Sequence, residues 1–323
     1  GGQITVRADQ GNVLVNGVLD VSAPEVTLPN GQKVGASAGA IVLQATGQAS
    51  DAHESGAVVW GQDAKIKGRA VSAAKSGRIS VDARRMVDAQ VTGGAVNQGA
   101  LDRLAQLAQA GDFHNEVVVR VREGDLALNT AIEAARVKIS ADVGQMALGA
   151  NAKIDARSVR GGLVQLAAGK DLIVGSGAQI LADSSISTEV GANGGDILLA
   201  STQGWVDLQA GATVSATGDD AADGRVVIRA KVDTTVTAET DDADAKRIQV
   251  RKIGATIKAA DLIVEGVQTY SSADGLNQQT QALSNTSVGA ITKIDVTKVV
   301  EAGKTYIVTT TSKGRGVQVE TVN

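Results

Sequence analysis

The sequence predicts an all-β solenoid, a parallel β-helix, from a short recurring phrase and from a composition that suits a narrow core. The phrase is a glycine followed by alternating polar and aliphatic residues that end on a small one, and it is clearest at Gly162 and again at Gly195. The chain holds 38 Gly, 2 Pro and 2% aromatic residues. Aromatic side chains bury the most area each and usually help to fill a spherical core. A chain with one Phe is therefore expected to have a narrow core.

The repeat predicts three very short strands, each introduced by a Gly or Gly-Ala corner, and the recurring phrase is the first of them. Its third and fifth residues are aliphatic and its seventh is small, while the others are mostly polar, so one set is expected to point inward and the other outward. A strand of about five residues buries too little alone, so equivalent strands are expected to stack about 4.8 Å apart. The long interval after Gly77 is expected to hide one degenerate copy, and the best candidate is Val117–Val121. The clear copies start at Gly2, Gly39, Gly77, Gly162, Gly195 and Gly224.

Two other repeat architectures fit the sequence less well. A propeller blade needs antiparallel strands joined by hairpin turns, whereas the corners here are single Gly or Gly-Ala steps. A leucine-rich repeat needs a Leu-x-x-Leu-x-Leu framework, which this chain lacks.

Residues 97–111 interrupt the pattern and predict a short helix near 99–110. The leucines there are three residues apart, Asn97 is a candidate N-cap, and Gly111 follows the last periodic position. The expected role of the helix is a lid on the flank of the solenoid, a corner that has grown. The alternative role is a protruding recognition element.

The chain is expected to divide into repeats at 1–269 and a different C-terminal segment at 270–323. Residues 270–287 are rich in Ser, Asn, Gln and Thr and predict a polar loop. Thr- and Val-rich strands follow, as terminal coils or as a cap. A solenoid end without a cap would expose strand edges to aggregation.

Charge and composition exclude several classes of function. The net charge is −4 and the basic residues are scattered, so no nucleic-acid partner is expected. Cysteine is absent, which excludes disulfides and Cys-based zinc sites. No stretch approaches the roughly 18 apolar residues of a membrane span. Because the N-terminus begins inside the repeat pattern, the chain is expected to be a segment of a longer protein.

Acidic residues cluster at two predicted corners, where calcium is the one cofactor considered. Clustered carboxylates suit this cation, but neither run matches an EF-hand or a calcium-binding nonapeptide, so a solvated acidic corner is the main expectation. Gly218-Asp219-Asp220 also resembles the G-D-D element of polygalacturonases, but the companion motifs of that family are absent, and no catalytic residue is assigned. The candidate metal ligands are Asp219, Asp220, Asp223, Asp241, Asp242 and Asp244.

The two tryptophans are candidate carbohydrate-binding residues. Trp205 falls at an outward strand position, and Trp60 ends a strand just before a glycine corner. An exposed indole can stack on a sugar ring, whereas packing beneath a neighbouring loop is the ordinary role.

The repeats resemble the coils of the filamentous haemagglutinin family, the large exoproteins of two-partner secretion in Gram-negative bacteria. The shared pattern is G-x-I-x-L-x-A, then G-x-V-x-L and G-A-x-I-x-A, as at Gly204–Leu208 and Gly211–Ala216, and it covers residues 1 to about 260. The resemblance implies a right-handed parallel β-helix that is secreted through an outer-membrane pore to the cell surface or extracellular matrix. It also implies a role in adhesion, biofilm or toxin delivery, although neither a secretion domain nor a toxin domain is recognisable.

Three functions are carried forward from the sequence. The first is a non-enzymatic rod that supports adhesion or a biofilm matrix, with host-cell or matrix polysaccharide or neighbouring adhesin chains as partners. The second is a β-helical polysaccharide lyase or hydrolase. The third is a self-associating filament module in which an exposed strand edge pairs with another chain.

Overall fold

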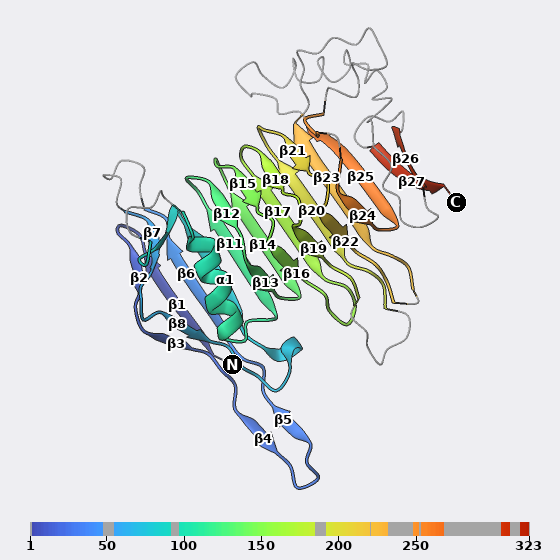
Figure 1. The fold of residues 1–323 in the computed structure, drawn as a ribbon. Coiled ribbons are helices and arrows are strands. Elements are labelled where there is room, and N and C mark those ends of the chain that lie inside the picture. Colours follow the sequence, from blue (N-terminus) through green and yellow to red (C-terminus); the bar gives the residue numbers. More distant parts are fainter. Residues whose placement is uncertain are drawn as a thin grey trace, which may run out of the picture.

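The computed structural model describes residues 2–47, 55–91, 97–184, 192–219, 221–231, 248–251 and 253–267, together with two strands at 305–310 and 317–322. This part of the chain is mostly β, with long parallel sheets and one α-helix (Figure 1). The all-β class predicted from the sequence is confirmed.

The largest sheet contains the opening strand of every repeat. Its parallel strands follow chain order, and each pairs in register with the opening strand of the next repeat, for example Val164 with Ile197 and Ile197 with Val226. The chain therefore leaves this sheet after each strand and returns one position further along. The strands are β1 (Gln3–Ala8), β6 (Ala40–Ala45), β9 (Arg78–Ala83), β11 (Glu116–Val121), β14 (Arg136–Ala141), β17 (Leu163–Ala168), β20 (Asp196–Ser201), β23 (Arg225–Lys231) and β25 (Asp261–Val267).

The second and third strands of the repeats form shorter parallel sheets. Second strands are β2 (Val13–Val15), β7 (Ala57–Trp60) and β10 (Arg85–Asp88) in one sheet, and β12 (Leu126–Leu128), β15 (Met146–Leu148), β18 (Leu172–Val174) and β21 (Val206–Leu208) in another. Third strands are β3 (Val18–Asp20) and β8 (Lys65–Lys67), and then β13 (Ala131–Glu133), β16 (Lys153–Asp155), β19 (Gln179–Leu181), β22 (Thr213–Ser215) and β24 (Thr256–Lys258).

Aliphatic side chains stacked in columns fill the core, as the alternation predicts. Val137, Val164 and Ile197 occupy one register position in successive repeats, and all are fully buried. At the corner after the third strand, Ala156 and Ala182 occupy equivalent positions and are also fully buried. Aliphatic residues line the strands and small residues line the corners, which explains why the core needs so few aromatic residues.

The glycine that opens a repeat is required by close approach of the neighbouring repeat. A Cβ atom on Gly195 would lie 2.0 Å from the Gly162 carbonyl oxygen, and one on Gly224 would lie 1.9 Å from the Gly195 carbonyl oxygen. Real Cβ contacts are not this short, so a side chain at either position would force the repeats apart. The glycine that defines the phrase is therefore a consequence of stacking.

The interval between Gly77 and Gly162 holds two opening strands, so the prediction of one hidden copy is corrected. The candidate Val117–Val121 lies in β11, which pairs with β9 on one side and with β14 on the other. Strand β14 was missed because Ala135, not glycine, precedes it, and β25 was missed because Ala260 precedes it.

The predicted helix is present as α1 (Ala100–Ala110), but it is neither a lid nor a protrusion. It takes the place of a third strand, because it follows β9 and β10 and packs against β8 on one side and β13 on the other (Figure 1). Its apolar residues fill the core between these strands. The buried residues of α1 are Ala100, Leu101, Leu104, Ala105, Leu107 and Ala108.

Asn97 is not the N-cap of α1, so that prediction is also corrected. The N-cap is Gly99, which adopts a left-handed conformation with φ of 69°. The buried Asn97 side chain links two other segments instead. Its Oδ1 accepts from the Met86 amide at 2.7 Å, and its Nδ2 donates to the Glu123 carbonyl at 2.8 Å. The side chain joins the segments before and after α1, and this bonding accounts for its burial.

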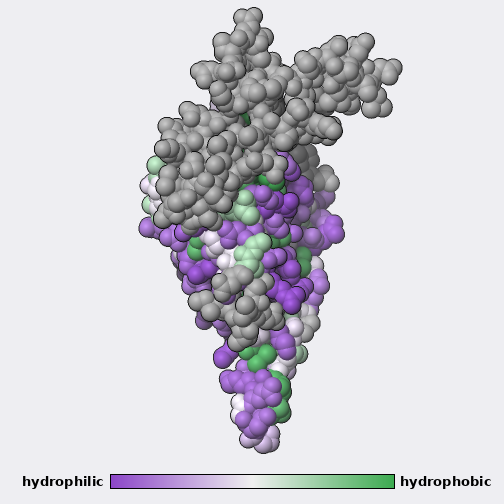
Figure 2. Space-filling view, turned by 90° about the vertical axis from the view of Figure 1, so that its right-hand side faces the viewer, coloured by the Kyte–Doolittle hydropathy of each residue, from purple (hydrophilic) through white to green (hydrophobic). Residues whose placement is uncertain are grey.

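Two antiparallel hairpins flank the parallel sheets. The hairpin of β4 (Glu25–Thr27) and β5 (Lys33–Gly35) was not predicted, and it projects at the lower end of the molecule in both views (Figures 1 and 2). The other hairpin joins β26 (Thr305–Thr310) to β27 (Val317–Val322), and β27 pairs antiparallel with β25. The predicted polar loop at 270–287 lies outside the described residues.

The position of α1 inside the stack yields a stability prediction. Leu104→Ala should lower the free energy of unfolding by about 2–5 kcal/mol, because it leaves a cavity in a packed core. Gln106→Ala, on the exposed side of the same helix, should change it by less than about 0.5 kcal/mol. Thermal and urea unfolding of both variants would measure the difference. Similar small changes for both would indicate that α1 lies loosely on the flank.

Candidate functional site

Trp60 is part of the core and does not offer a surface to a sugar. It ends β7, and its side chain is 0% exposed. The structure corrects the carbohydrate-binding prediction for this residue. Strand β7 lies between β2 and β10, so Trp60 is covered by neighbouring repeats on both sides.

Trp205 lies immediately before β21 and is partly exposed, as its outward position predicted. Its backbone amide donates to the Asp171 carboxylate at 2.8 Å. The Arg251 guanidinium carbon lies 5.3 Å from the ring centroid, a cation–π contact. The same guanidinium lies 3.8 Å from the Asp207 carboxylate. One ring face is thus occupied by an arginine from the next repeat, and sugar stacking at Trp205 stays a prediction.

The acidic corner at Asp219 is partly used to hold its own loop. The Asp223 carboxylate accepts a 2.9 Å hydrogen bond from the Gly218 amide, and the Asp219 amide donates to the Ala192 carbonyl at 3.0 Å. Among the described residues, no three His, Cys, Asp or Glu side chains gather as a metal site would require. Calcium binding stays a prediction, because the remaining candidates, Asp220, Asp241, Asp242 and Asp244, lie outside the described residues.

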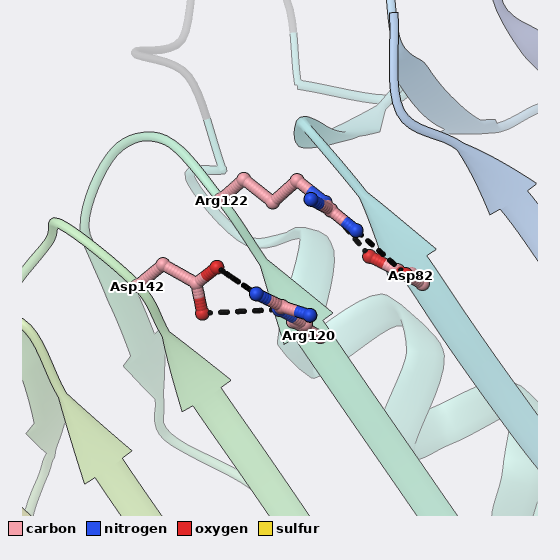
Figure 3. Close-up of polar contacts among 4 residues, drawn as sticks. All are labelled: Asp82, Arg120, Arg122 and Asp142. Atoms are coloured by element: carbon pink, nitrogen blue, oxygen red, sulfur yellow. Dashed lines mark hydrogen bonds and ion pairs between the residues drawn. The ribbon is translucent and has the colours of Figure 1, made fainter. Parts of the chain in front are cut away.

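Charged side chains on the outer face of the large sheet pair across neighbouring repeats. Arg120 on β11 binds the Asp142 carboxylate, which follows β14, with its Nε 2.9 Å from Oδ2 (Figure 3). Arg122 makes two 3.0 Å bonds to Asp82 on β9 (Figure 3). Each pair links two coils, and together these pairs join β11 to both of its neighbours. Exposed ion pairs of this kind each contribute at most about 1 kcal/mol to the free energy of unfolding. In each pair, the arginine and the carboxylate neutralise one another.

The outward arginines of later strands are engaged in the same way. Arg225 lies 3.2 Å from the Asp196 carboxylate, and Arg229 lies 2.6 Å from Glu265. Both pairs again join adjacent strands of the large sheet. These pairs hold adjacent coils together on the outer face of the sheet.

The best candidate for a chemical site is a groove of about 1010 Å³ at the corner that follows β13, β16 and β19. It carries carboxylates, two arginines, a histidine and three hydroxyls, which is a set that acid–base chemistry could use. Sequence reasoning missed this groove because its residues come from separate repeats. The available signal was a charged or polar residue at the end of each third strand or two residues beyond it, as with Glu133, Asp155, Asp183 and Thr217. The polar lining includes His114, Glu133, Asp155, Arg157, Asp183 and Thr217.

Two of the groove carboxylates, those of Asp155 and Asp183, are held in structural bonds. Burial by itself would raise the pKa of Asp155, but hydrogen bonds from Arg157 and Lys153 outweigh it and lower this pKa from 3.8 to about 2. Asp183 accepts from the Ser215 hydroxyl at 2.5 Å and from the Thr217 amide and hydroxyl at 2.7 and 2.9 Å. These bonds tie consecutive corners together.

His114 is also held by its surroundings. Its Nδ1 lies 3.2 Å from the Glu133 carbonyl oxygen, and its backbone amide donates to the Ser76 hydroxyl at 2.9 Å. Its Nε2 lies 3.7 Å from the Asp112 carboxylate. The ring therefore bridges two segments at the edge of the groove. His53, the other histidine, lies outside the described residues.

The lowered pKa of Asp155 predicts an acid-sensitive contribution to stability. A depressed carboxyl pKa stabilises the fold above pH 3.8, and this stabilisation is lost as the pH falls towards about 2. Asp155→Asn should therefore have a lower melting temperature than the parent chain at neutral pH. The difference between the two melting temperatures should narrow as the pH falls from 3.8 to about 2. For Arg157→Ala, the difference in melting temperature from the parent chain should narrow in the same way but by less. A gap that stays constant down to pH 2 would contradict the role assigned to these bonds.

No helix in the described part of the chain is long and apolar enough to cross a membrane. Comparisons with protein-family models, with curated proteins and with solved structures find no match to this chain. Its function must therefore be inferred from its own repeats and surfaces.

Proposed function

We propose that this chain is a right-handed parallel β-helix that serves as a stiff, non-enzymatic shaft in a secreted bacterial surface protein of the filamentous haemagglutinin type. The observation that carries the proposal is the unbroken register of the large sheet from β1 to β25, with a buried aliphatic column beneath it. Right-handedness is supported by the strong general preference of parallel strand–crossover–strand connections for that hand.

The shaft works by geometry. Strands β1 to β25 of the large sheet, at about 4.8 Å per step, span roughly 40 Å. Bending such a rod would break hydrogen bonds in all of its sheets, so it would hold an attached binding region at a fixed distance. The paired outward charges support this function, because they bind one coil to the next.

Location and partners follow from the same proposal. The repeat phrase supports secretion through an outer-membrane pore to the cell surface or matrix, where polysaccharides or neighbouring adhesin chains would be the partners. The absence of cysteine is consistent with export through an oxidising compartment, since no unwanted disulfide can form.

The groove beside β13, β16 and β19 favours one second candidate, a polysaccharide lyase or hydrolase. Its carboxylates, Arg157 and His114 are the side-chain types that acid–base chemistry on a sugar polymer uses. A general acid or base works best with a pKa near the operating pH, however, and the pKa of Asp155 is about 2. The shaft is therefore the preferred function.

An assay against a panel of acidic polysaccharides distinguishes the shaft from the polysaccharide lyase or hydrolase. The shaft should produce no new chain ends and no unsaturated products, which absorbance and reducing-end assays would detect. Turnover that Asp155→Asn, Asp219→Ala or Asp220→Ala abolishes would overturn the shaft proposal. Val143→Ala, at a side chain that is 57% exposed, is a matched control for handling and folding.

In the adhesive form of the proposal, the same panel also tests Trp205. Any polysaccharide that binds through this indole should lose most of its affinity in Trp205→Ala and retain it in Val143→Ala. Isothermal titration with the best binder would measure both. Equal affinity for the two variants would remove Trp205 from the binding surface.

A further inference from the structure

The stack is built differently between the coil of β9, β10 and α1 and the coil of β11, β12 and β13. Three parallel ladders join β14, β15 and β16 to β17, β18 and β19, and three more join those strands to β20, β21 and β22. Between the coil of α1 and the next coil, the described residues form one ladder, β9 with β11. Strand β10 ends one second-strand sheet and β12 begins another, while α1 stands where a third strand would lie (Figure 1).

Backbone contacts fix α1 to the coils before it. The Gly68 amide, just after β8, donates to the carbonyl of Gly111, the C-cap of α1, at 2.7 Å. A Cβ atom on Gly111 would lie 2.1 Å from the Ile66 carbonyl oxygen, so these two segments touch backbone to backbone. Arg103 in α1 also donates to the Gln62 carbonyl at 3.3 Å. The helix therefore belongs to the N-terminal part of the stack.

Side chains make the contacts of α1 with the coil after it. Among the described residues, no backbone hydrogen bond joins β10 or α1 to β12 or β13. The helix packs against these two strands, and the Asp102 carboxylate accepts a 2.7 Å hydrogen bond from the Asn129 amide. The Asn97 side chain donates to the Glu123 carbonyl at 2.8 Å, and the Glu123 carboxylate lies 2.7 Å from Arg84. This boundary thus combines one backbone ladder with side-chain contacts.

The two kinds of contact resist bending differently. A ladder holds its strands through directional hydrogen bonds, which weaken steeply when the strands separate or turn. Packed helices, in contrast, shift by about 1–2 Å in shear motions that leave their own backbone paired. Between the later coils, a tilt about the large sheet breaks two further ladders. At the boundary after α1, the same tilt meets the packing of α1 on β12 and β13 in their place.

We propose that this boundary is a joint in the shaft, at which the two parts tilt relative to one another about the β9–β11 ladder while α1 slides on β12 and β13. Each part stays stiff through its own ladders. The joint lets the region that the shaft carries change direction without unpairing a strand. It depends on neither the location nor the partners proposed for the shaft, and its failure would leave a uniformly stiff shaft.

Spin labels on pairs of introduced cysteines test the joint, and the parent chain has no cysteine to interfere. The four labelled positions each open a third strand: Lys65 and Gln179 lie on opposite sides of the boundary, and Ala131 and Thr256 lie on the same side. Both pairs are separated by four coil steps, which is about 19 Å for the second pair. Pulsed electron paramagnetic resonance should give a distance distribution about 1–2 Å broader for the first pair than for the second.

Two variants connect the width to the contacts at the boundary. Asp102→Ala, added to the first pair, removes a bond that crosses the boundary and should broaden that distribution further. Asp102→Asn keeps an acceptor oxygen and should restore the parent width. Asp125→Ala is the matched control, because Asp125 accepts the Gln145 amide at 2.8 Å between two coils that three ladders join, and it should leave the second pair unchanged. Equal widths for the two pairs in the otherwise unaltered chain, or equal broadening by Asp125→Ala and Asp102→Ala, would overturn the proposal.

Discussion

The fold depends on one constraint, the in-register stacking of each repeat on the one before it. Stacking buries the aliphatic columns, pairs the backbone of the short strands, and brings corners so close that Gly195 and Gly224 have no space for a side chain. The outer ion pairs follow from it as well, since Arg122 reaches Asp82 because β11 lies beside β9. A three-residue strand such as β18 would not be stable alone, and its two neighbours supply its partners.

The same constraint explains what could be predicted from the sequence. The opening strands at all six clear copies are present. At five of the six, a Cβ atom on the opening glycine would lie less than 3 Å from a backbone atom, whereas one on Gly2 would meet nothing within 4 Å. Close packing therefore requires glycine at these five positions and leaves a visible signature. Strands β14 and β25 follow an alanine, which removed that signature although the aliphatic alternation persists. The helix was predicted from its leucine spacing, but its place in the stack depends on β8 and β13, which lie on other repeats. Local patterns predicted elements, and long-range contacts determined their roles.

The candidate site was harder to predict for a related reason. The groove joins His114, Asp155 and Asp183 from different repeats, and no motif in one stretch of sequence unites them. Trp60 and Trp205 looked alike as aromatic residues beside glycine corners, yet one is in the core and the other is partly exposed. Polar groups in the groove mostly bind one another, as Asp155 does with Arg157, so their recurrence reflects the stacking of corners.

The most direct test of the stacking account is to delete one full repeat, residues 163–195. The register places Leu163 level with Asp196, so the deletion brings β20 to the position of β17, against β14. Arg136, which is level with Leu163, would then face Asp196, a favourable pair. The shortened chain should fold cooperatively with an unchanged circular dichroism spectrum and a moderately lower melting temperature. An unfolded or aggregated product, with the matched parent intact, would show that the repeats are not interchangeable stacking units.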